Sequence, residues 1–305
     1  MLRISSLSKV RLSKPELALV AVTMVWGGTF LVVQIAMAHG GPAYFVAARF
    51  LAAGALMALL FHRSLRGFTK IELLAGSAIG MALFLGYALQ SFGLQSISSS
   101  KSAFITALYV PIVPLLQWLV LRRPPRLLSW IGINLAFLGL VLLAGPEALQ
   151  IGLGVGEIAT LVGAIAIAAE IILISRFANR VDSKRITVAQ LLACGLFALV
   201  FAVVSGEALP NVSDGLWIAC ALGLAVASAV IQFTMNWAQK AVSPTKATLI
   251  YAGEPVWAGV VGRIAGERLP ALAILGGAFI VLGVIVSELK LKGKAKGDAE
   301  KPRVC

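Results

Sequence analysis

Three charged side chains lie inside long apolar segments, where a charge is costly. Glu254 stands within ATLIYAGEPVWAGVVG (residues 247–262), next to Pro255, and Arg49 and Glu170 have similarly apolar surroundings. Placing Arg or Asp at the centre of a membrane helix costs about 2.5–3.5 kcal/mol, so such residues usually face a cavity or a partner. A carboxylate there can attract the amine of a small molecule or exchange a proton. Glu254 is therefore the leading candidate for chemistry in this chain.

Pro255 indicates what surrounds Glu254. Proline cannot donate to the helical hydrogen-bond ladder and clashes with the preceding turn, so carbonyls one turn earlier lose their regular partners. In lipid this is tolerated only where protein or a wet cavity satisfies the freed groups. Pro111 and Pro114 carry the same implication for segment 99–121. Both segments are therefore expected to face a polar interior.

The sequence also places uncharged polar and aromatic side chains at the spacing of one helix face. Segment 214–237 and the residues directly after it carry Gln232, Asn236 and Gln239 at i, i+4 and i+7. Other such residues form a stripe in segment 71–93, or lie near the midplane or close to the proline bends. With Glu254 they make up the candidate substrate-binding residues: Trp26, Tyr87, Gln90, Tyr109, Gln232, Asn236, Tyr251 and Glu254.

Structural roles compete with binding roles for several of these residues. Arg49 can pair with helix-end carbonyls or reach outward, Glu170 can form interhelical hydrogen bonds while protonated, Trp26 can serve packing, and the amide stripe can join helices. At about 1.5 Å per residue, Glu254 lies near the midplane, Glu170 nearer the cytoplasm and Arg49 nearer the outer face. No direct pairing of Arg49 with Glu170 is predicted, and the roles of both stay open.

Composition identifies the solvent of this chain. Of 305 residues, 59% are hydrophobic and 13% charged, and the mean hydropathy is +0.94. Soluble domains are about 45–50% apolar and roughly 25% charged, so the bilayer must solvate much of this surface. The net charge of +13 does not indicate nucleic acid, because the basic residues sit in short runs between apolar segments rather than on one face. The three cysteines are far apart, which predicts neither a metal site nor a disulfide framework.

About 20 apolar residues cross a bilayer as a helix. Ten segments meet this requirement: 16–38, 42–62, 71–93, 99–121, 127–145, 154–175, 186–205, 214–237, 244–265 and 270–289. The first is too long for a cleaved signal peptide and is interpreted as a retained helix. The expected fold is thus an all-α membrane protein with ten transmembrane helices.

Basic residues orient these segments, because cytoplasmic loops collect Lys and Arg. With the N-terminus inside, 22 of the 26 basic residues fall on the inner side and three on the outer side, while Arg49 stays within a span. We therefore expect both termini in the cytoplasm and a multi-pass protein of a bacterial inner membrane. The sequence leaves open whether the chain forms a homodimer.

An internal repeat divides the chain. A shift of 144 residues lays 111–141 on 255–285 without a gap, with Pro111 on Pro255. A shift of 141 lays RFLAAGALMAL (49–59) on QLLACGLFALV (190–200). Because each copy holds five helices, the second enters the membrane upside down, as in many secondary transporters. The predicted parts are a basic N-tail (1–15), a first repeat (16–145), a second repeat (154–289) and a basic C-tail (290–305).

Two stretches resemble the EamA-type members of the drug/metabolite transporter superfamily. VWGGTFLVVQIAMAHGGPAYFVAARFLAAG (25–54) is similar to the start of that family, with Trp26-Gly27, Pro42 and Arg49-Phe50 as its markers. GEPVWAGVVGRIAGERL (253–269) is similar to its ninth helix and the end of that helix. The similarity covers roughly residues 15–290.

The resemblance implies two inverted five-helix repeats around a central cavity lined mainly by helices 1, 3, 4, 6, 8 and 9. It also implies efflux of small metabolites such as amino acids. Two departures stand out. The first-repeat match to Gly266-Glu267 reads Arg122-Arg123, which weakens any idea of an acidic hinge shared by both halves. Ile167 stands where the family usually has an aromatic residue, so the second half of the cavity is expected to be less aromatic.

A secondary transporter that exports a small polar metabolite by alternating access is the leading hypothesis, without cofactor or metal and with a small-molecule substrate and the bilayer as partners. The alternative is an intramembrane enzyme acting on a lipid or small solute. It is disfavoured because His39 and His62 lie at opposite membrane faces and the spans contain no HExxH or GxSxG motif. An ATP-driven pump is excluded by the lack of a GxxxxGK[ST] loop.

Overall fold

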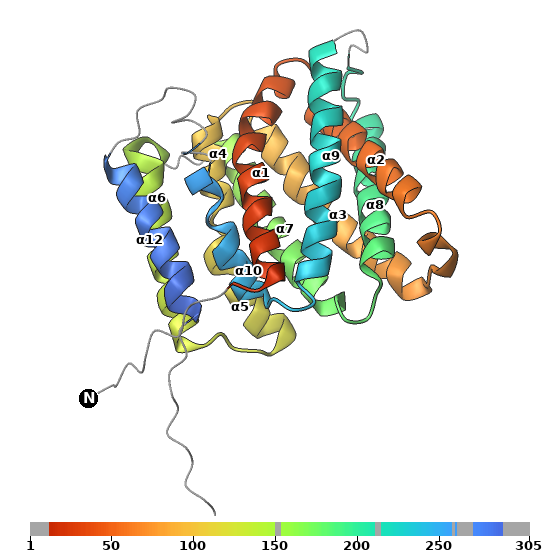
Figure 1. Ribbon diagram of the computed structural model, residues 1–305. Helices are drawn as coiled ribbons and strands as arrows, with labels where there is room; N and C mark the ends of the chain where they lie inside the picture. Colours follow the sequence, from red (N-terminus) through yellow and green to blue (C-terminus); the bar gives the residue numbers. More distant parts are fainter. Residues whose placement is uncertain (1–11, 150–153, 211–214, 258–259, 261–270, 289–305) are drawn as a thin grey trace, which may run out of the picture.

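The protein is helical in a computed structural model that describes residues 12–149, 154–210, 215–257, 260 and 271–288, and no strand occurs among these residues. The helices, labelled as in Figure 1, are α1 (Lys14–Met37), α2 (Pro42–Leu60), the short 3-10 helix η1 (Ser64–Gly67), α3 (Lys70–Gly93), α4 (Ser99–Thr106), α5 (Tyr109–Leu121), α6 (Leu127–Leu149), α7 (Val155–Phe177), α8 (Ser183–Val204), α9 (Gly215–Ala238), α10 (Pro244–Tyr251) and α12 (Ala271–Glu288).

These helices fit the ten predicted segments. All ten segments begin within three residues of the start of a helix. Segment 99–121 does not form one continuous helix, because it is divided into α4 and α5. Segment 244–265 is described only in its first part, through α10 and the residues up to 257. Gly266-Glu267, the C-tail 290–305 and most of the N-tail lie outside the described residues.

Large apolar side chains cover the outside of the bundle, as expected if lipid rather than water surrounds it. Leu59, Leu74, Leu119 and Val204 are each more than 70% exposed. Seven helical runs in the described part of the chain are long and apolar enough to cross a membrane, and α6 and α12 contain two shorter apolar stretches. The chain is therefore a multi-pass membrane protein.

The helices lie side by side with their axes roughly up and down in Figure 1. α1, α3, α7 and α9 occupy the middle, α2 and α8 lie on the right, and α6 and α12 pack together on the left. The start of α1 and the end of α12 lie at the lower end of this view. α4 lies toward the upper end and α10 toward the lower end, which matters for the site described below.

Two helices are interrupted beside a proline. Between α4 and α5 the amide of Val110 donates to the carbonyl of Ala107 at 2.9 Å, and after α10 the amide of Gly253 donates to the carbonyl of Ile250 at 3.0 Å. Both are i→i−3 bonds, which tighten the turn relative to an α-helix. Each precedes a proline that has no amide hydrogen to continue the ladder. The interruptions turn the side chains next to them toward the centre of the bundle.

Candidate functional site

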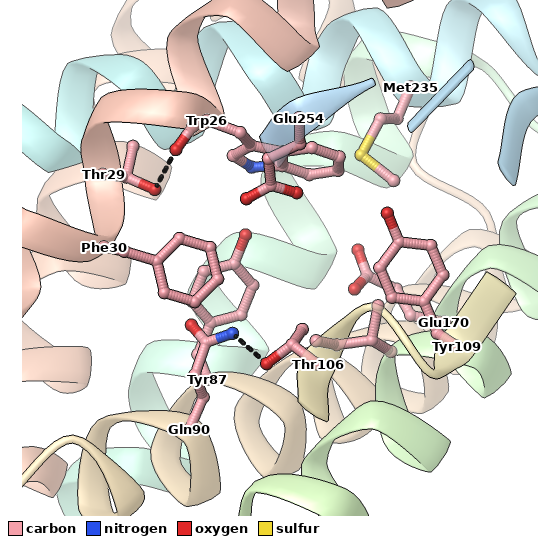
Figure 2. A pocket seen from close by; sticks show the side chains of 11 residues that line it. Trp26, Thr29, Phe30, Tyr87, Gln90, Thr106, Tyr109, Glu170, Met235 and Glu254 are labelled. Atoms are coloured by element: carbon pink, nitrogen blue, oxygen red, sulfur yellow. Dashed lines mark hydrogen bonds between the residues drawn. The ribbon is translucent and has the colours of Figure 1, made fainter. Parts of the chain in front are cut away.

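A small cavity lies at the centre of the bundle, where both interruptions meet the long helices (Figure 2). Its volume is about 40 Å³, enough for two or three waters at roughly 10–15 Å³ each. Pockets that hold a ligand usually measure about 300–1,000 Å³. The structure therefore shows a contracted state of this cavity, and a metabolite would enter only after the helices move apart.

The cavity is lined by the helices that the family resemblance implied. Helices α1, α3, α7 and α9 contribute, together with residues flanking the break between α4 and α5 and one residue after α10. The lining residues are Trp26, Thr29, Phe30, Tyr87, Gln90, Thr106, Tyr109, Ile167, Glu170, Met235 and Glu254.

Two carboxyl groups, Glu170 and Glu254, enter this cavity from different helices (Figure 2). Glu170 is only 2% exposed, and its Oε1 has no hydrogen-bond partner among the described residues. Neither glutamate forms an ion pair in the described part of the chain. A buried carboxylate without a partner is costly. These two groups are therefore poised to take up a cation or a proton.

Aromatic rings form much of the cavity wall, and neighbouring residues fix the positions of two of them. The Trp26 ring packs edge-on against Tyr251, with ring centroids 5.2 Å apart. Tyr87 packs edge-on against Phe50 at 5.0 Å. Edge-to-face pairs of this kind hold rings in defined orientations. The rings of Trp26 and Tyr87 are thus held firmly where they meet the cavity.

Arg49 lies behind Tyr87 rather than in the cavity lining. Its guanidinium carbon is 4.8 Å from the Tyr87 ring centroid and 5.2 Å from that of Phe50, while its Nε donates to the Ser228 hydroxyl at 2.7 Å. The side chain is 2% exposed and one terminal nitrogen has no partner among the described residues. The Arg49 guanidinium is therefore buried among aromatic rings and does not reach outward to the membrane surface, one of the two structural roles considered from the sequence. Cation–π contact with buried rings stabilises it instead.

Uncharged polar groups complete the lining. The side-chain amide of Gln90 donates to the hydroxyl of Thr106 at 3.0 Å, which ties α3 to the end of α4. The Thr29 hydroxyl donates to the carbonyl of Trp26 at 2.9 Å. The carbonyl oxygen of Gln90 lies at the cavity edge (Figure 2). This part of the wall can accept hydrogen bonds from a bound molecule.

The amide stripe of α9 lies outside the lining. Gln232 accepts from the Gln190 side chain at 2.8 Å, and the Asn236 amide donates to the Gln190 side chain at 3.1 Å and to the Thr187 hydroxyl at 3.0 Å. All four residues are buried between α8 and α9. Their hydrogen bonds join two helices, which was the alternative role considered for this stripe.

The structure thus brings together some of the predicted substrate-binding residues. Trp26, Tyr87, Gln90, Tyr109 and Glu254 share one cavity. Glu170, whose depth along its helix suggested a place nearer the cytoplasm, lies in the same cavity. Tyr251 is fully buried beneath the Trp26 ring, and the amide of Gln239 lies 3.4 Å from its hydroxyl.

Sequence reasoning did not single out the other lining residues as candidates for binding. Thr29 and Phe30 follow Trp26 by three and four positions, so the helical period could have found them. Thr106 and Met235 carry no such signal, because a threonine or methionine in an apolar helix is common. Ile167 was noticed only as a departure from the family pattern.

Comparison with known proteins agrees with this architecture. The EamA-like transporter family matches residues 13–145 and 154–289. An uncharacterized transporter of Archaeoglobus fulgidus is 29% identical over 90% of this chain and 86% of its own length. The uncharacterized inner membrane transporter YedA of Escherichia coli K12 is also 29% identical, over 89% of this chain and 90% of its own.

A solved crystal structure shares the fold, with a TM-score of 0.72 over 90% of this chain and 98% of that chain, at 18% identity. At that identity the likeness speaks for the fold alone. The family match, in contrast, spans most of the chain and includes every lining residue of the cavity. The chain belongs to the EamA-like transporter family and is a multi-pass membrane transporter.

Proposed function

We propose that this transporter exports a small polar metabolite, of the amino-acid class or related amines, by alternating access between two inverted five-helix repeats. The observation that carries the proposal is the cavity itself, where helices from both halves meet and two carboxyl groups form no ion pair with any described residue. Such a site can bind an amine in one state and a proton in another. Midplane sites between inverted repeats are typical of secondary transporters.

Reciprocal contacts support the repeat. The shift of 144 residues relates Gly132 to Gly276 and Gly139 to Gly283. A Cβ atom built on Gly132 would lie 2.6 Å from the carbonyl oxygen of Gly283, and one on Gly139 would meet the carbonyl of Gly276. Gly132 therefore faces the repeat equivalent of Gly139, and Gly139 faces the repeat equivalent of Gly132, which is what a two-fold axis requires.

A second reciprocal pair joins α2 to α8. Gly54 and Leu51 correspond to Gly195 and Leu192 under the shift of 141. A Cβ on Gly54 would lie 2.6 Å from Leu192 Cδ2, and a Cβ on Gly195 would lie 2.8 Å from the Leu51 amide nitrogen. This exchange of partners between the two halves supports the same axis independently.

Two ion pairs follow the same symmetry and suggest how access alternates. Lys246, at the start of α10, pairs with Glu16 at the start of α1, and Lys101, in α4, pairs with Glu157 at the start of α7. The first pair lies toward the lower end of Figure 1 and the second toward the upper end. In our proposal each pair holds one end closed, and the contracted cavity reflects a state in which both are formed.

In the proposed topology both termini are cytoplasmic, so the Lys246–Glu16 pair closes the inner end. This placement fits the start of α1 and the end of α12 at one end of the bundle. Labelling of single cysteines from each side of intact cells tests it. Strong labelling at position 180 from outside would overturn the assignment.

The intramembrane enzyme draws no specific support from the cavity, whose described lining contains neither histidine nor cysteine. Purified protein in sealed proteoliposomes tests the transport proposal directly. Labelled amino acids and related amines are loaded, with and without a pH gradient and without ATP. Unchanged solute crossing the membrane faster than in protein-free vesicles supports the proposal. Chemical conversion of the solute without its movement would point to the enzyme.

A further inference from the structure

Every acidic or basic residue of the described cavity lining is a glutamate. Glu170 and Glu254 are the acidic residues of the described lining, and no lysine, arginine or histidine belongs to it. The nearest basic group considered above, Arg49, stands behind the Tyr87 ring and bonds Ser228. A bound solute therefore meets carboxyl groups, with no basic side chain in the described lining.

The aromatic residues of the cavity wall also favour a positively charged solute. Four aromatic residues face the same small volume: Trp26, Phe30, Tyr87 and Tyr109. The face of an aromatic ring attracts cations, and cages of such rings recognise ammonium groups. Figure 2 shows rings of these residues around the space that the two carboxyl groups enter. Rings and carboxylates favour the same charge on the bound molecule.

An amino acid would fit this wall poorly. Its ammonium group could meet Glu170 or Glu254, but its own carboxylate would then lie close to acidic groups and to ring faces, both of which repel an anion. A buried charge without a partner is strongly disfavoured. In the described lining only uncharged groups, such as the amide of Gln90 and the hydroxyls of Thr106, Tyr87 and Tyr109, could offer hydrogen bonds to that carboxylate.

We propose that the substrate is a small organic cation, an ammonium group on an apolar body that carries no carboxylate. This inference rests on the proposed transport function and narrows its substrate class. The ammonium group lies between the carboxyl groups of Glu170 and Glu254, and the apolar body packs on the aromatic wall. Because the cavity is only about 40 Å³ here, the cation binds to a state in which the helices have separated.

Pairs of solutes that differ only in a carboxylate test whether the site disfavours that group. Cadaverine is lysine without its carboxylate, and phenethylamine is phenylalanine without it. Binding to the full-length protein in detergent is measured from the rise in melting temperature with solute concentration, and flux is measured in proteoliposomes. We expect each amine to bind at least tenfold more tightly than its amino acid, and to be transported in preference to it. Equal or tighter binding of the amino acids would overturn the inference.

Binding and flux separate this inference from the proposed function. Preferential binding of amines without movement of any solute would support the cation site and contradict transport. Transport of amino acids with no binding of amines would do the reverse. Both results are decisive, because binding does not depend on the protein being reconstituted in an active orientation.

Substitutions of the two glutamates test whether they form the amine-binding site. Glu170→Gln and Glu254→Gln should each weaken amine binding by about tenfold or more, since removing one member of a buried charge pair is costly. The control is Glu207→Gln, which removes a carboxylate that caps the start of α2, with amides of Ala43 and Tyr44 at 3.0 and 2.8 Å. That variant should keep the affinity for amines. Unchanged affinity in both cavity variants would contradict the proposed site.

A matched pair of tryptophan variants tests the contribution of the aromatic wall to amine binding. Trp26→Leu should weaken amine binding about threefold to tenfold, because a cation–π contact contributes about 1 kcal/mol and more when desolvated. Trp118→Leu removes an exposed tryptophan of α5 and should leave binding unchanged. Glu254→Asp keeps the charge and should retain the preference for amines over amino acids even if its affinity falls. Loss of that preference in the Asp variant would argue against charge selection.

Discussion

Glutamates at the helix ends and glutamates in the cavity have opposite surroundings. Glu16, Glu72 and Glu157 each lie in the first turn of a helix and pair with a basic side chain. Glu170 and Glu254 line the central cavity and have no such partner in the described part of the chain. All five side chains are of one type, so the difference comes from position alone.

Glu72 is the fullest example of the first group. Its side chain, 2% exposed, accepts from the Asp182 amide at 3.0 Å, from the Arg185 Nε at 2.8 Å and from the amide and hydroxyl of Thr69, each at 2.9 Å. It thereby caps its own helix and joins α3 to the start of α8. Such a carboxylate contributes to stability because its donors would otherwise be unsatisfied.

The cavity carboxyls form no ion pair of this kind in the described part of the chain. A charged residue at the membrane centre carries an insertion cost of about 2.5–3.5 kcal/mol, which neither Glu170 nor Glu254 offsets with an ion pair in the described structure. From this comparison we expect the first group to hold the fold together and the second group to respond to what enters the cavity. Changes in the two groups should therefore affect different measurements.

The largest effect is expected for Glu254→Gln on transport. The amide keeps the shape and can still form hydrogen bonds, so the protein should insert and melt close to wild type. It can hold neither a charge opposite an ammonium group nor an exchangeable proton. Transport in proteoliposomes at two pH values should fall by about a hundredfold, on the order of two decades for one lost charge contact, and lose its pH dependence.

Two companion variants make this test sharper. Glu254→Ala should also insert and lose transport, and Glu254→Asp should fall between, because its charge withdraws by one methylene. Near-normal, pH-dependent transport by the Gln variant, with a weakened Ala variant, would move Glu254 into the structural group and break the comparison.

The next effect is a loss of stability in Glu72→Ala. Removing this carboxylate leaves the donors of Thr69, Asp182 and Arg185 without their partner, and each buried unsatisfied group costs about 1–3 kcal/mol. We expect a clear drop in melting temperature of the detergent-purified protein, with transport per folded molecule retained. A Glu72→Ala protein that melts normally but fails to transport would contradict the division between the groups.

A smaller effect is expected when one end of the bundle is loosened. A reporter cysteine at position 167, in the cavity lining, is placed in a background without Cys194, Cys220 and Cys305. Lys101→Met should raise labelling of the reporter from the outer side, and Lys246→Met from the inner side. Partly exposed ion pairs contribute about 0.2–1 kcal/mol, so each change should be about twofold to fivefold. Labelling that rises from the same side in both variants would contradict two symmetric closures.

Sequence patterns predicted the helices well because hydrophobic length and basic loops report directly on membrane crossing. They did not predict the division of segment 99–121 at Ala107 and Leu108. Pro111 predicted an irregularity in the helix there, but a proline alone does not determine whether a helix kinks or ends. The choice depends on what satisfies the freed carbonyls, which is a property of the neighbouring helices.

The candidate site was harder to predict for the same reason. Asn236 and Glu254 both looked like polar residues facing an interior, yet Asn236 meets Gln190 and Thr187 on α8 whereas Glu254 meets the cavity. A helical stripe shows that a face is polar but not which helix it faces. Counting residues gives the depth of Glu170 along its own helix but does not account for how the helices are arranged, so it did not show that Glu170 shares the cavity with Glu254.

The smallest expected effect concerns the Lys101–Glu157 pair, which tests whether every helix-end glutamate contributes equally to stability. Its Nζ–Oε1 distance is 2.7 Å, close to the 2.8 Å of the Arg185–Glu72 pair. Distance alone would therefore predict similar coupling. Exposure differs, because the Lys101 and Glu157 side chains are 20% and 13% exposed, whereas Glu72 is 2% exposed.

Double-mutant cycles with Lys101→Met and Glu157→Gln, and with Arg185→Met and Glu72→Gln, measure the coupling in each pair. We expect about 0.2–1 kcal/mol for the first, because water and salt screen a partly exposed pair. The second should be larger, since Glu72 also holds Thr69 and Asp182 in place. Melting at low and high salt gives a second readout, in which the Lys101 cycle weakens with salt and the Glu72 cycle changes less. Equal coupling that responds equally to salt would show that burial does not distinguish these pairs, and the helix-end group would then have to be explained by distance alone.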